Sequence, residues 1–174
     1  MLVNLSDVLT SEGKVETVTV PLEMTSFKSR LGEFLITQKS PAAFTFTNIG
    51  VDKAKVEGSA EIKFETRCDR CLTEVPTVLN LEFDRVVTSP GTATEDEEDD
   101  EIGFMEGYQF DVEAFVYHEI MLNWPVKILC QDECKGVCPV CGQNLNKKDC
   151  GCDTFVPDPR MAAIKDIFNA NKEV

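Results

Sequence analysis

The sequence predicts an α+β protein: a predominantly antiparallel β core, either a barrel or a strongly twisted sheet, with a few helices and a small C-terminal cysteine-rich module. Three observations predict this class. Apolar and polar residues alternate in short runs between residues 15 and 88, where no helical periodicity occurs. A helical stripe follows that region, and six of the eight cysteines then lie within residues 130–152. With 174 residues, 43% of them hydrophobic, the chain is long enough to bury a core.

The first expected elements are short. Ser6 can act as the N-cap of a single helical turn that ends near Gly13. The β-branched alternation over residues 15–20 predicts a strand, which Pro21 stops. Similar alternation predicts three more strands, at residues 33–37, 43–48 and 54–65.

The last of these strands leads into a predicted hairpin. In residues 54–65 apolar side chains take one face and charged side chains the other, which is typical of a half-buried antiparallel strand. Residues 72–87 predict a returning strand, broken at Pro76. The turn between the two strands carries Cys68 and Cys71, and at a hairpin tip both sulfurs can project together.

Two longer helices are predicted in the second half of the chain. Asp111 can cap a helix over residues 111–123, whose apolar residues form one stripe that can pack on the sheet. Asp158 and Pro159 suit the start of a C-terminal helix. We therefore expect a β-rich core domain with an acidic loop, followed by a cysteine-rich module. The core spans residues 1–124 with its loop at 92–104, and the module spans residues 125–174.

The net charge of −14 argues against a protein that simply coats nucleic acid. Residues 95–101 are all acidic and are predicted to be a solvated loop, although such a run could also mimic a phosphate backbone or engage a basic protein. No apolar run approaches the roughly 20 residues that cross a bilayer. The first residues lack the features of a signal peptide, so we expect a cytoplasmic protein with reduced cysteines.

The cysteines predict metal binding. Cys138-Pro-Val-Cys141-Gly142 has the form of a zinc knuckle, and Cys150-Gly-Cys152 offers a second pair of sulfurs. We call this set the C-terminal site. The remaining four cysteines suggest a second, tentative set, the hairpin site, which would join the middle of the chain to its C-terminal part. The hairpin site consists of Cys68, Cys71, Cys130 and Cys134.

Zinc in a closed, structural site is the favoured interpretation of these sets. Four thiolates can also hold an iron-sulfur cluster, and disulfides or buried free thiols are further alternatives. Catalytic zinc usually keeps one position open for water and uses histidine or carboxylate ligands. The one histidine, His118, lies off the apolar stripe and has no nucleophile near it in the sequence. No catalytic residue is therefore predicted.

Several motifs together resemble one bacterial family, the YceD family of large ribosomal RNA subunit accumulation proteins. The resemblance extends over nearly the whole chain, because motifs near both ends take part. They are Asn4-Leu-Ser6, Cys68-Asp-Arg70-Cys71, the stretch from Cys130 to Asn146, Cys150-Gly-Cys152 and Asp158-Pro-Arg-Met-Ala-Ala-Ile-Lys165.

The resemblance implies a non-enzymatic ribosome biogenesis factor, needed for processing or accumulation of 23S rRNA in large-subunit assembly. The implied partners are the pre-ribosomal large subunit, through 23S rRNA precursor or a basic ribosomal protein, with no membrane and no small-molecule substrate. A metal-dependent RNA-processing hydrolase and a zinc-ribbon interaction adaptor remain as alternatives. Basic residues around the first knuckle are the candidate contacts to RNA or a partner: Lys63, Arg67, Arg70 and Arg85.

Overall fold

The computed structural model describes residues 1–89 and 104–153. The predicted C-terminal helix lies outside the described residues, as does the predicted acidic loop except for Phe104. The division into domains at residues 124 and 125 stays a prediction. The described elements are β1 (Leu2–Asn4), α1 (Ser6–Thr10), β2 (Val15–Val20), β3 (Ser26–Ser29), β4 (Gly32–Lys39), β5 (Ala42–Gly50), β6 (Lys53–Arg67), β7 (Glu74–Thr88), β8 (Met105–Glu106), β9 (Gln109–Asp111) and α3 (Val112–Leu122).

Strand β6 is the centre of a six-stranded antiparallel sheet. Strand β7 pairs with it along its whole length, from Lys53 opposite Thr88 to Arg67 opposite Glu74. On the other edge of β6, β5 pairs with the first half and β4 with the second half. Strands β2 and β3 continue the sheet beyond β5 and β4. Within the described residues this is an open sheet, so the prediction of a mostly antiparallel β core is confirmed in its twisted-sheet form.

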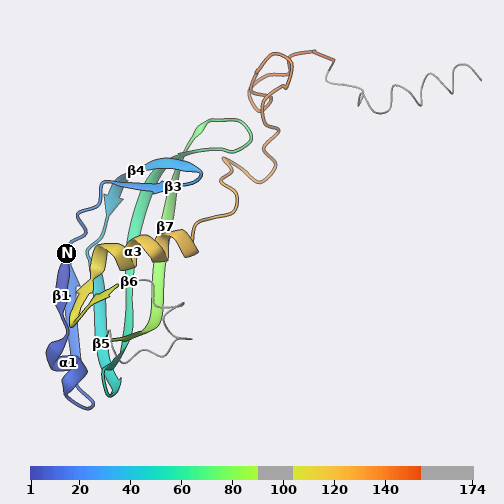
Figure 1. Ribbon diagram of the computed structural model, residues 1–174. Coiled ribbons are helices and arrows are strands. Elements are labelled where there is room, and N and C mark those ends of the chain that lie inside the picture. Colours follow the sequence, from blue (N-terminus) through green and yellow to red (C-terminus); the bar gives the residue numbers. More distant parts are fainter. Residues whose placement is uncertain (90–103, 154–174) are drawn as a thin grey trace, which may run out of the picture.

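Helix α3 crosses one face of the sheet (Figure 1). The carboxylate of Asp111 caps it by accepting hydrogen bonds from the N–H groups of Glu113 and Ala114. Its predicted apolar stripe is buried and consists of Val112, Phe115, Val116 and Ile120. Phe115 contacts the rings of Phe44, Phe83 and Phe110, so aromatic packing between the helix and the sheet forms the main core.

Two details of the sequence prediction are wrong. Ser6 is the first residue of α1 rather than its cap, and the Asn4 side chain accepts the hydrogen bond from the Ser6 N–H. Strand β7 continues through Pro76, which lies opposite Glu65. Strand β7 pairs with β6 alone among the described strands, and an edge strand tolerates a residue without an N–H group.

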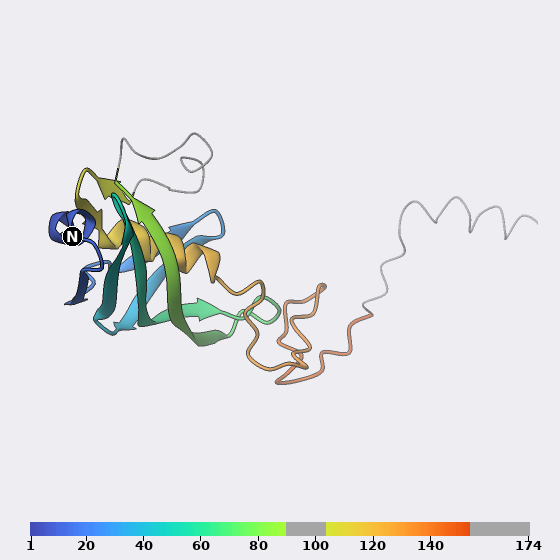
Figure 2. The same cartoon turned by 90° about the horizontal axis from the view of Figure 1, so that it is seen from below.

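The β6–β7 hairpin determines where the cysteine-rich segment lies. The hairpin tip projects beyond the body of the sheet, and the cysteine-rich segment lies beside this tip (Figure 2). Residues 123–153 contain no helix or strand, apart from an isolated bridge between Val137 and Asn144. Backbone pairing therefore gives this segment little order of its own.

Candidate metal centres

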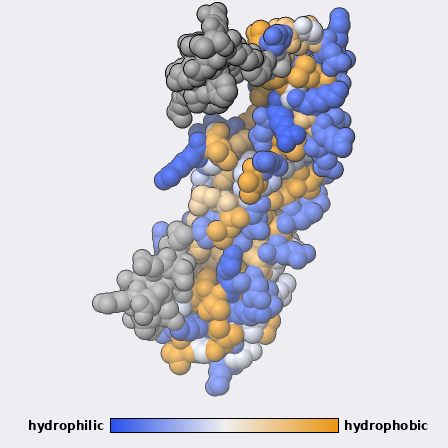
Figure 3. Space-filling view, turned by 90° about the vertical axis from the view of Figure 1, so that its right-hand side faces the viewer, coloured by the Kyte–Doolittle hydropathy of each residue, from blue (hydrophilic) through white to orange (hydrophobic). Residues whose placement is uncertain are grey.

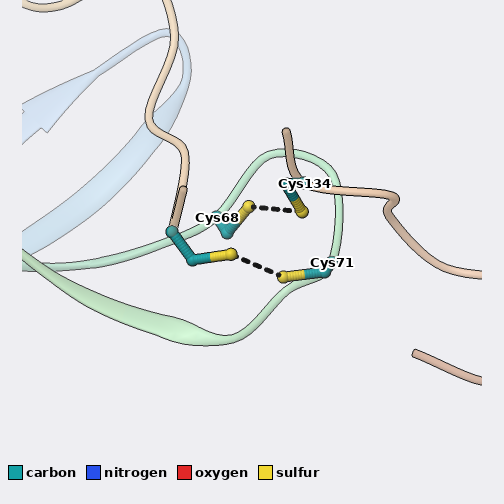
Figure 4. A group of neighbouring side chains, drawn as sticks. Cys68, Cys71 and Cys134 are labelled. Atoms are coloured by element: carbon teal, nitrogen blue, oxygen red, sulfur yellow. Dashed lines mark hydrogen bonds between the residues drawn. The ribbon is translucent and has the colours of Figure 1, made fainter. Parts of the chain in front are cut away.

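The tip of the β6–β7 hairpin forms a tight knuckle. The N–H of Leu72 donates to the carbonyl oxygen of Cys68 at 2.9 Å, and the Cys68 N–H donates to Thr73 at 2.8 Å. These bonds close the turn and aim the sulfurs of Cys68 and Cys71 to the same side (Figure 4). Leu72 has a positive φ of 60°, which a residue with a side chain rarely adopts.

The segment after α3 attaches to this tip through Asp69 and Arg70. Asp69 donates its N–H to Ile128 at 2.8 Å and accepts the Ile128 N–H on its carboxylate at 2.7 Å. Arg70 donates from its guanidinium to the carbonyl oxygen of Cys134 at 2.9 Å. The approach is close: a Cβ at Gly136 would lie 3.1 Å from the Arg70 carbonyl oxygen. These contacts place Cys130 and Cys134 beside Cys68 and Cys71.

The four sulfurs of the hairpin site all lie within 4.8 Å of one another. Cys68 and Cys134 are 3.7 Å apart at Sγ (Figure 4), and the Sγ atoms of Cys71 and Cys130 are 3.5 Å apart. Four sulfurs around a zinc ion at about 2.3 Å would be separated by about 3.8 Å, whereas a disulfide is only about 2.05 Å long. The spacing fits four separate ligands, and the structure records the cysteines as free.

The C-terminal site repeats the same turn. The N–H of Gly142 donates to the carbonyl oxygen of Cys138 at 2.8 Å, as Leu72 does to Cys68, and Gly142 has a φ of 73°. Gly151 has a φ of 66°, which turns Cys150 and Cys152 toward the knuckle. The sulfurs of Cys138, Cys141, Cys150 and Cys152 also lie within 4.8 Å of one another.

The two sites differ in burial. Three cysteines of the hairpin site are buried, and they contact the side chains of Val75 and Leu129; Cys130 is the exposed member. In the C-terminal site only Cys138 is buried. The hairpin site is therefore part of a small apolar cluster, whereas the C-terminal site lies closer to solvent.

Two asparagines connect the sites. Asn146 lies between Cys141 and Cys150 in the sequence, yet its amide donates to Sγ of Cys134 in the hairpin site at 3.2 Å. Its oxygen accepts the N–H of Lys135 at 2.8 Å. Asn144 donates to the hydroxyl of Thr73 at 3.2 Å. Hydrogen bonds of this kind orient metal ligands, and sequence reasoning did not identify these residues.

Without a metal, each site contains both thiols with a lowered pKa and thiols with a raised pKa: the pKa is lowered for Cys68, Cys71 and Cys138 and raised for Cys130, Cys150 and Cys152. The Thr73 hydroxyl and N–H lower the pKa of Cys71 to about 6, and the N–H groups of Cys141 and Val140 lower that of Cys138 to about 7. The neighbouring sulfur of Cys71 raises the pKa of Cys130 to about 12. Cys141 has the same effect on Cys152. A metal ion that binds all four sulfurs of a site would have to displace the protons of the thiols that resist ionisation.

The four basic residues predicted as contacts do not form one surface around the tip. The guanidinium of Arg70 donates a hydrogen bond to the carbonyl oxygen of Cys134, and Lys63 donates to the Gln38 side chain at 3.0 Å. Arg67 is exposed at the end of β6. Arg85 is paired opposite Val56, far along the hairpin from the tip, and its Nε donates to the buried Glu119 carboxylate at 2.8 Å. The expectation that Arg85 surrounds the knuckle is therefore wrong.

Comparison with known proteins gives one family and several distant relatives. A family model described as large ribosomal RNA subunit accumulation protein YceD matches residues 56–168, which include all eight cysteines. Uncharacterized proteins of Mycobacterium bovis and Mycobacterium tuberculosis are each 26% identical over 119 residues, covering 68% of this chain and 57% of theirs. An uncharacterized protein of Mycobacterium leprae is 26% identical over 91 residues, covering 52% of this chain and 42% of its own. The chain thus spans between 42% and 57% of the length of these relatives. No solved structure matches it significantly.

Proposed function

Because this chain belongs to the YceD family, we propose that it is a non-enzymatic ribosome biogenesis factor needed for processing or accumulation of 23S rRNA in large-subunit assembly. The family match over residues 56–168 is the observation that carries this proposal. We propose that the protein acts in the cytoplasm, where large-subunit precursors are assembled. No helix in the described part of the chain is long and apolar enough to cross a membrane.

The charge of the protein favours a protein contact within the pre-ribosomal large subunit. The chain carries a net charge of −14, which repels the phosphates of 23S rRNA precursor and attracts basic ribosomal proteins. Arg70 and Arg85, two of the four candidate RNA contacts, already bind groups of this chain. A basic ribosomal protein is therefore the preferred partner.

We propose that zinc fills both sites and holds structure. Each group of possible ligands found in the described residues consists of four cysteines, with no histidine or carboxylate. Four thiolates complete a tetrahedral zinc ion and leave no position for an activated water. The hairpin site would then fasten the cysteine-rich module, proposed at residues 125–174, to the core domain proposed at residues 1–124.

Depletion of the protein in cells tests the proposed function. We expect loss of mature 23S rRNA with accumulation of its precursor, measured by blotting, and recovery when the wild-type chain is restored. Purified zinc-loaded protein should leave 23S rRNA precursor intact. Normal 23S rRNA after depletion would contradict the proposal, and metal-dependent cleavage of the precursor would favour the alternative of an RNA-processing hydrolase.

A further inference from the structure

A groove with a volume of about 700 Å³ lies directly beside the hairpin site. Its wall includes Cys68, and its other lining residues come from the β3–β4 turn, the start of β4, the end of β6, the knuckle and the segment that follows α3. Three stretches of the chain, residues 31–35, 65–72 and 124–128, therefore converge here. The lining includes the apolar side chains of Leu31, Phe34, Leu35, Leu72, Trp124 and Val126. It also includes the charged side chains of Glu33, Glu65, Arg67 and Asp69.

The groove is lined by apolar side chains that remain in contact with solvent. Val126 is 97% exposed and Leu72 is 65% exposed, and Leu31 and Leu35 are also exposed. Phe34 and Trp124 are partly buried, with ring centroids 4.6 Å apart. Apolar side chains are scattered over the face seen in Figure 3, and exposed ones such as Ile49 and Val86 lie outside the groove lining, so exposure by itself does not identify a binding surface.

The backbone at Leu72 provides an independent observation. The equivalent position of the other knuckle is Gly142, which adopts positive φ without steric cost. Leu72 adopts the same conformation with a side chain, and that side chain gains little from burial because most of it is exposed. Strained backbone of this kind concentrates at binding sites. The fold of the knuckle does not require leucine here, and the exposed side chain lines the groove.

The charges of the lining select the class of partner. Three carboxylates, those of Glu33, Glu65 and Asp69, line the groove together with one guanidinium, that of Arg67. Two of these carboxylates already have a partner at one oxygen: Oε1 of Glu33 contacts Lys28 and Ser26, and Oδ2 of Asp69 accepts the Ile128 N–H. The chain as a whole is strongly acidic. A peptide that carries lysine or arginine beside an apolar side chain complements both features, whereas the phosphates of RNA would meet the carboxylates. The volume suits a short segment rather than a folded domain.

We propose that this groove binds a basic, apolar peptide segment of a protein partner in the pre-ribosomal large subunit, with Leu72 and Trp124 as the apolar contacts. This inference rests on the proposed function and names the class of partner. Because the hairpin site fixes Cys68 and the knuckle, bound zinc holds one wall of the groove in place. Binding of the segment is therefore coupled to zinc in the hairpin site.

Trp124 allows a direct measurement, because it is the one tryptophan in the sequence and it lines the groove. The full-length zinc-loaded protein is titrated with a short synthetic peptide of lysine and leucine while tryptophan emission is recorded. The comparison ligands are the peptide with glutamate in place of lysine and a uridine oligonucleotide. We expect a saturable change with the lysine peptide and at least tenfold weaker binding of the other two.

The variant Leu72→Gly separates binding from folding. Glycine suits the positive φ at this position, so the variant should keep both metals and a melting temperature no lower than that of the wild type. Its affinity for the lysine peptide should fall about tenfold or more. The control is Val140→Ser in the other knuckle, where Val140 is 59% exposed and outside the groove lining. This control should bind the peptide as the wild type does.

Four outcomes would overturn the groove proposal. The first two are no change in emission with the lysine peptide, and equal or tighter binding of the acidic peptide or the oligonucleotide. The third is an unchanged affinity of the Leu72→Gly variant for the lysine peptide. The fourth is emission that depends on protein concentration alone, which would indicate that a second copy of the chain occupies the groove. If depletion still reduces 23S rRNA, these outcomes leave the proposed function standing. The two proposals therefore fail separately.

Discussion

The two cysteine sites share the same knuckle turn but draw on different lengths of chain. In the C-terminal site all four cysteines come from residues 138–152. In the hairpin site Cys68 and Cys134 face each other across 66 positions of sequence. Closing the longer loop costs more chain entropy, so a metal that fixes it orders more of the molecule. The C-terminal site thus gathers its cysteines from one local loop, whereas the hairpin site gathers them from two distant regions of the sequence.

The largest effect is expected from Cys68→Ser. This variant should lose one metal ion per chain and release the segment around Ile128 and Cys134 from the hairpin tip. Structural zinc contributes on the order of 10 kcal/mol to folding in small modules, so loss of one ligand should unfold this attachment. Metal analysis measures the loss of the ion, and hydrogen exchange over residues 128–137 measures the release of the segment. Retention of two metals and unchanged protection would show that Cys68 is not needed to hold a metal in the hairpin site.

Cys150→Ser should have a more local effect. Removing a ligand of the C-terminal site should unfold residues 138–152 and expose them to protease, while β6, β7 and the metal of the hairpin site remain. Limited proteolysis with mass spectrometry and metal analysis distinguishes the two regions. If both metals leave together, the sites form one unit and the comparison drawn above is wrong.

Arg85→Met should destabilise the sheet and leave both metals bound. Glu119 is only 1% exposed, and loss of Arg85 would leave its carboxylate buried without a cation, at a cost of about 3 kcal/mol. Urea unfolding measures this cost, and Arg67→Met at the exposed end of β6 is the control, with an expected change of less than about 0.5 kcal/mol. Equal stability of the two variants would contradict a structural role for Arg85.

Asn146→Ala tests the connection between the sites. Asn146 lies within the loop of the C-terminal site, yet it donates to Cys134 of the hairpin site. Loss of such an outer hydrogen bond weakens metal affinity by about tenfold or more, and we expect the hairpin site to be the one affected. Competition with a chelator measures the two affinities. Gln143→Ala is the matched control. An equal effect of both variants on metal affinity would contradict a specific role for Asn146 in the hairpin site.

The smallest effect concerns pH in the metal-free protein. The pKa values of about 6 for Cys71 and about 7 for Cys138 lie below the ordinary value of 9.0, so at pH 7 Cys71 is mostly ionised and Cys138 is partly ionised. Their stabilising hydrogen bonds are fully present above pH 9 and are lost as pH falls through 7 and 6. The ultraviolet absorbance of thiolates, recorded during a pH titration of the metal-free protein, should therefore begin to rise near pH 6 to 7. A rise that begins only near pH 9 would contradict these lowered pKa values.

Much of the fold could be predicted because its signals are local. Alternation in residues 54–65 and the apolar stripe after Asp111 reflect burial of one face, and the structure contains both elements. The break expected at Pro76 was wrong because the edge position of β7 is a property of the whole sheet. Strands β1, β3, β8 and β9 were missed, since none exceeds four residues and such runs carry little periodicity.

The sequence predicted the C-terminal site more directly than the hairpin site. Spacing alone groups Cys138 with Cys141, whereas joining Cys68 to Cys134 needed an argument from the number of cysteines, and the structure does bring these sulfurs together. Binding of metal by either set stays a prediction. The roles of Asn146 and Arg85 depend on contacts between distant segments, which no local pattern indicates. The groove was missed for the same reason.

X-ray absorption at the zinc edge, combined with metal analysis of full-length protein purified under reducing conditions, tests the central claim most directly. We predict two zinc ions per chain, each surrounded by four sulfur atoms at about 2.3 Å. Protein that contains no metal, or a metal with nitrogen or oxygen in its first coordination shell, would contradict the account of two closed four-cysteine sites.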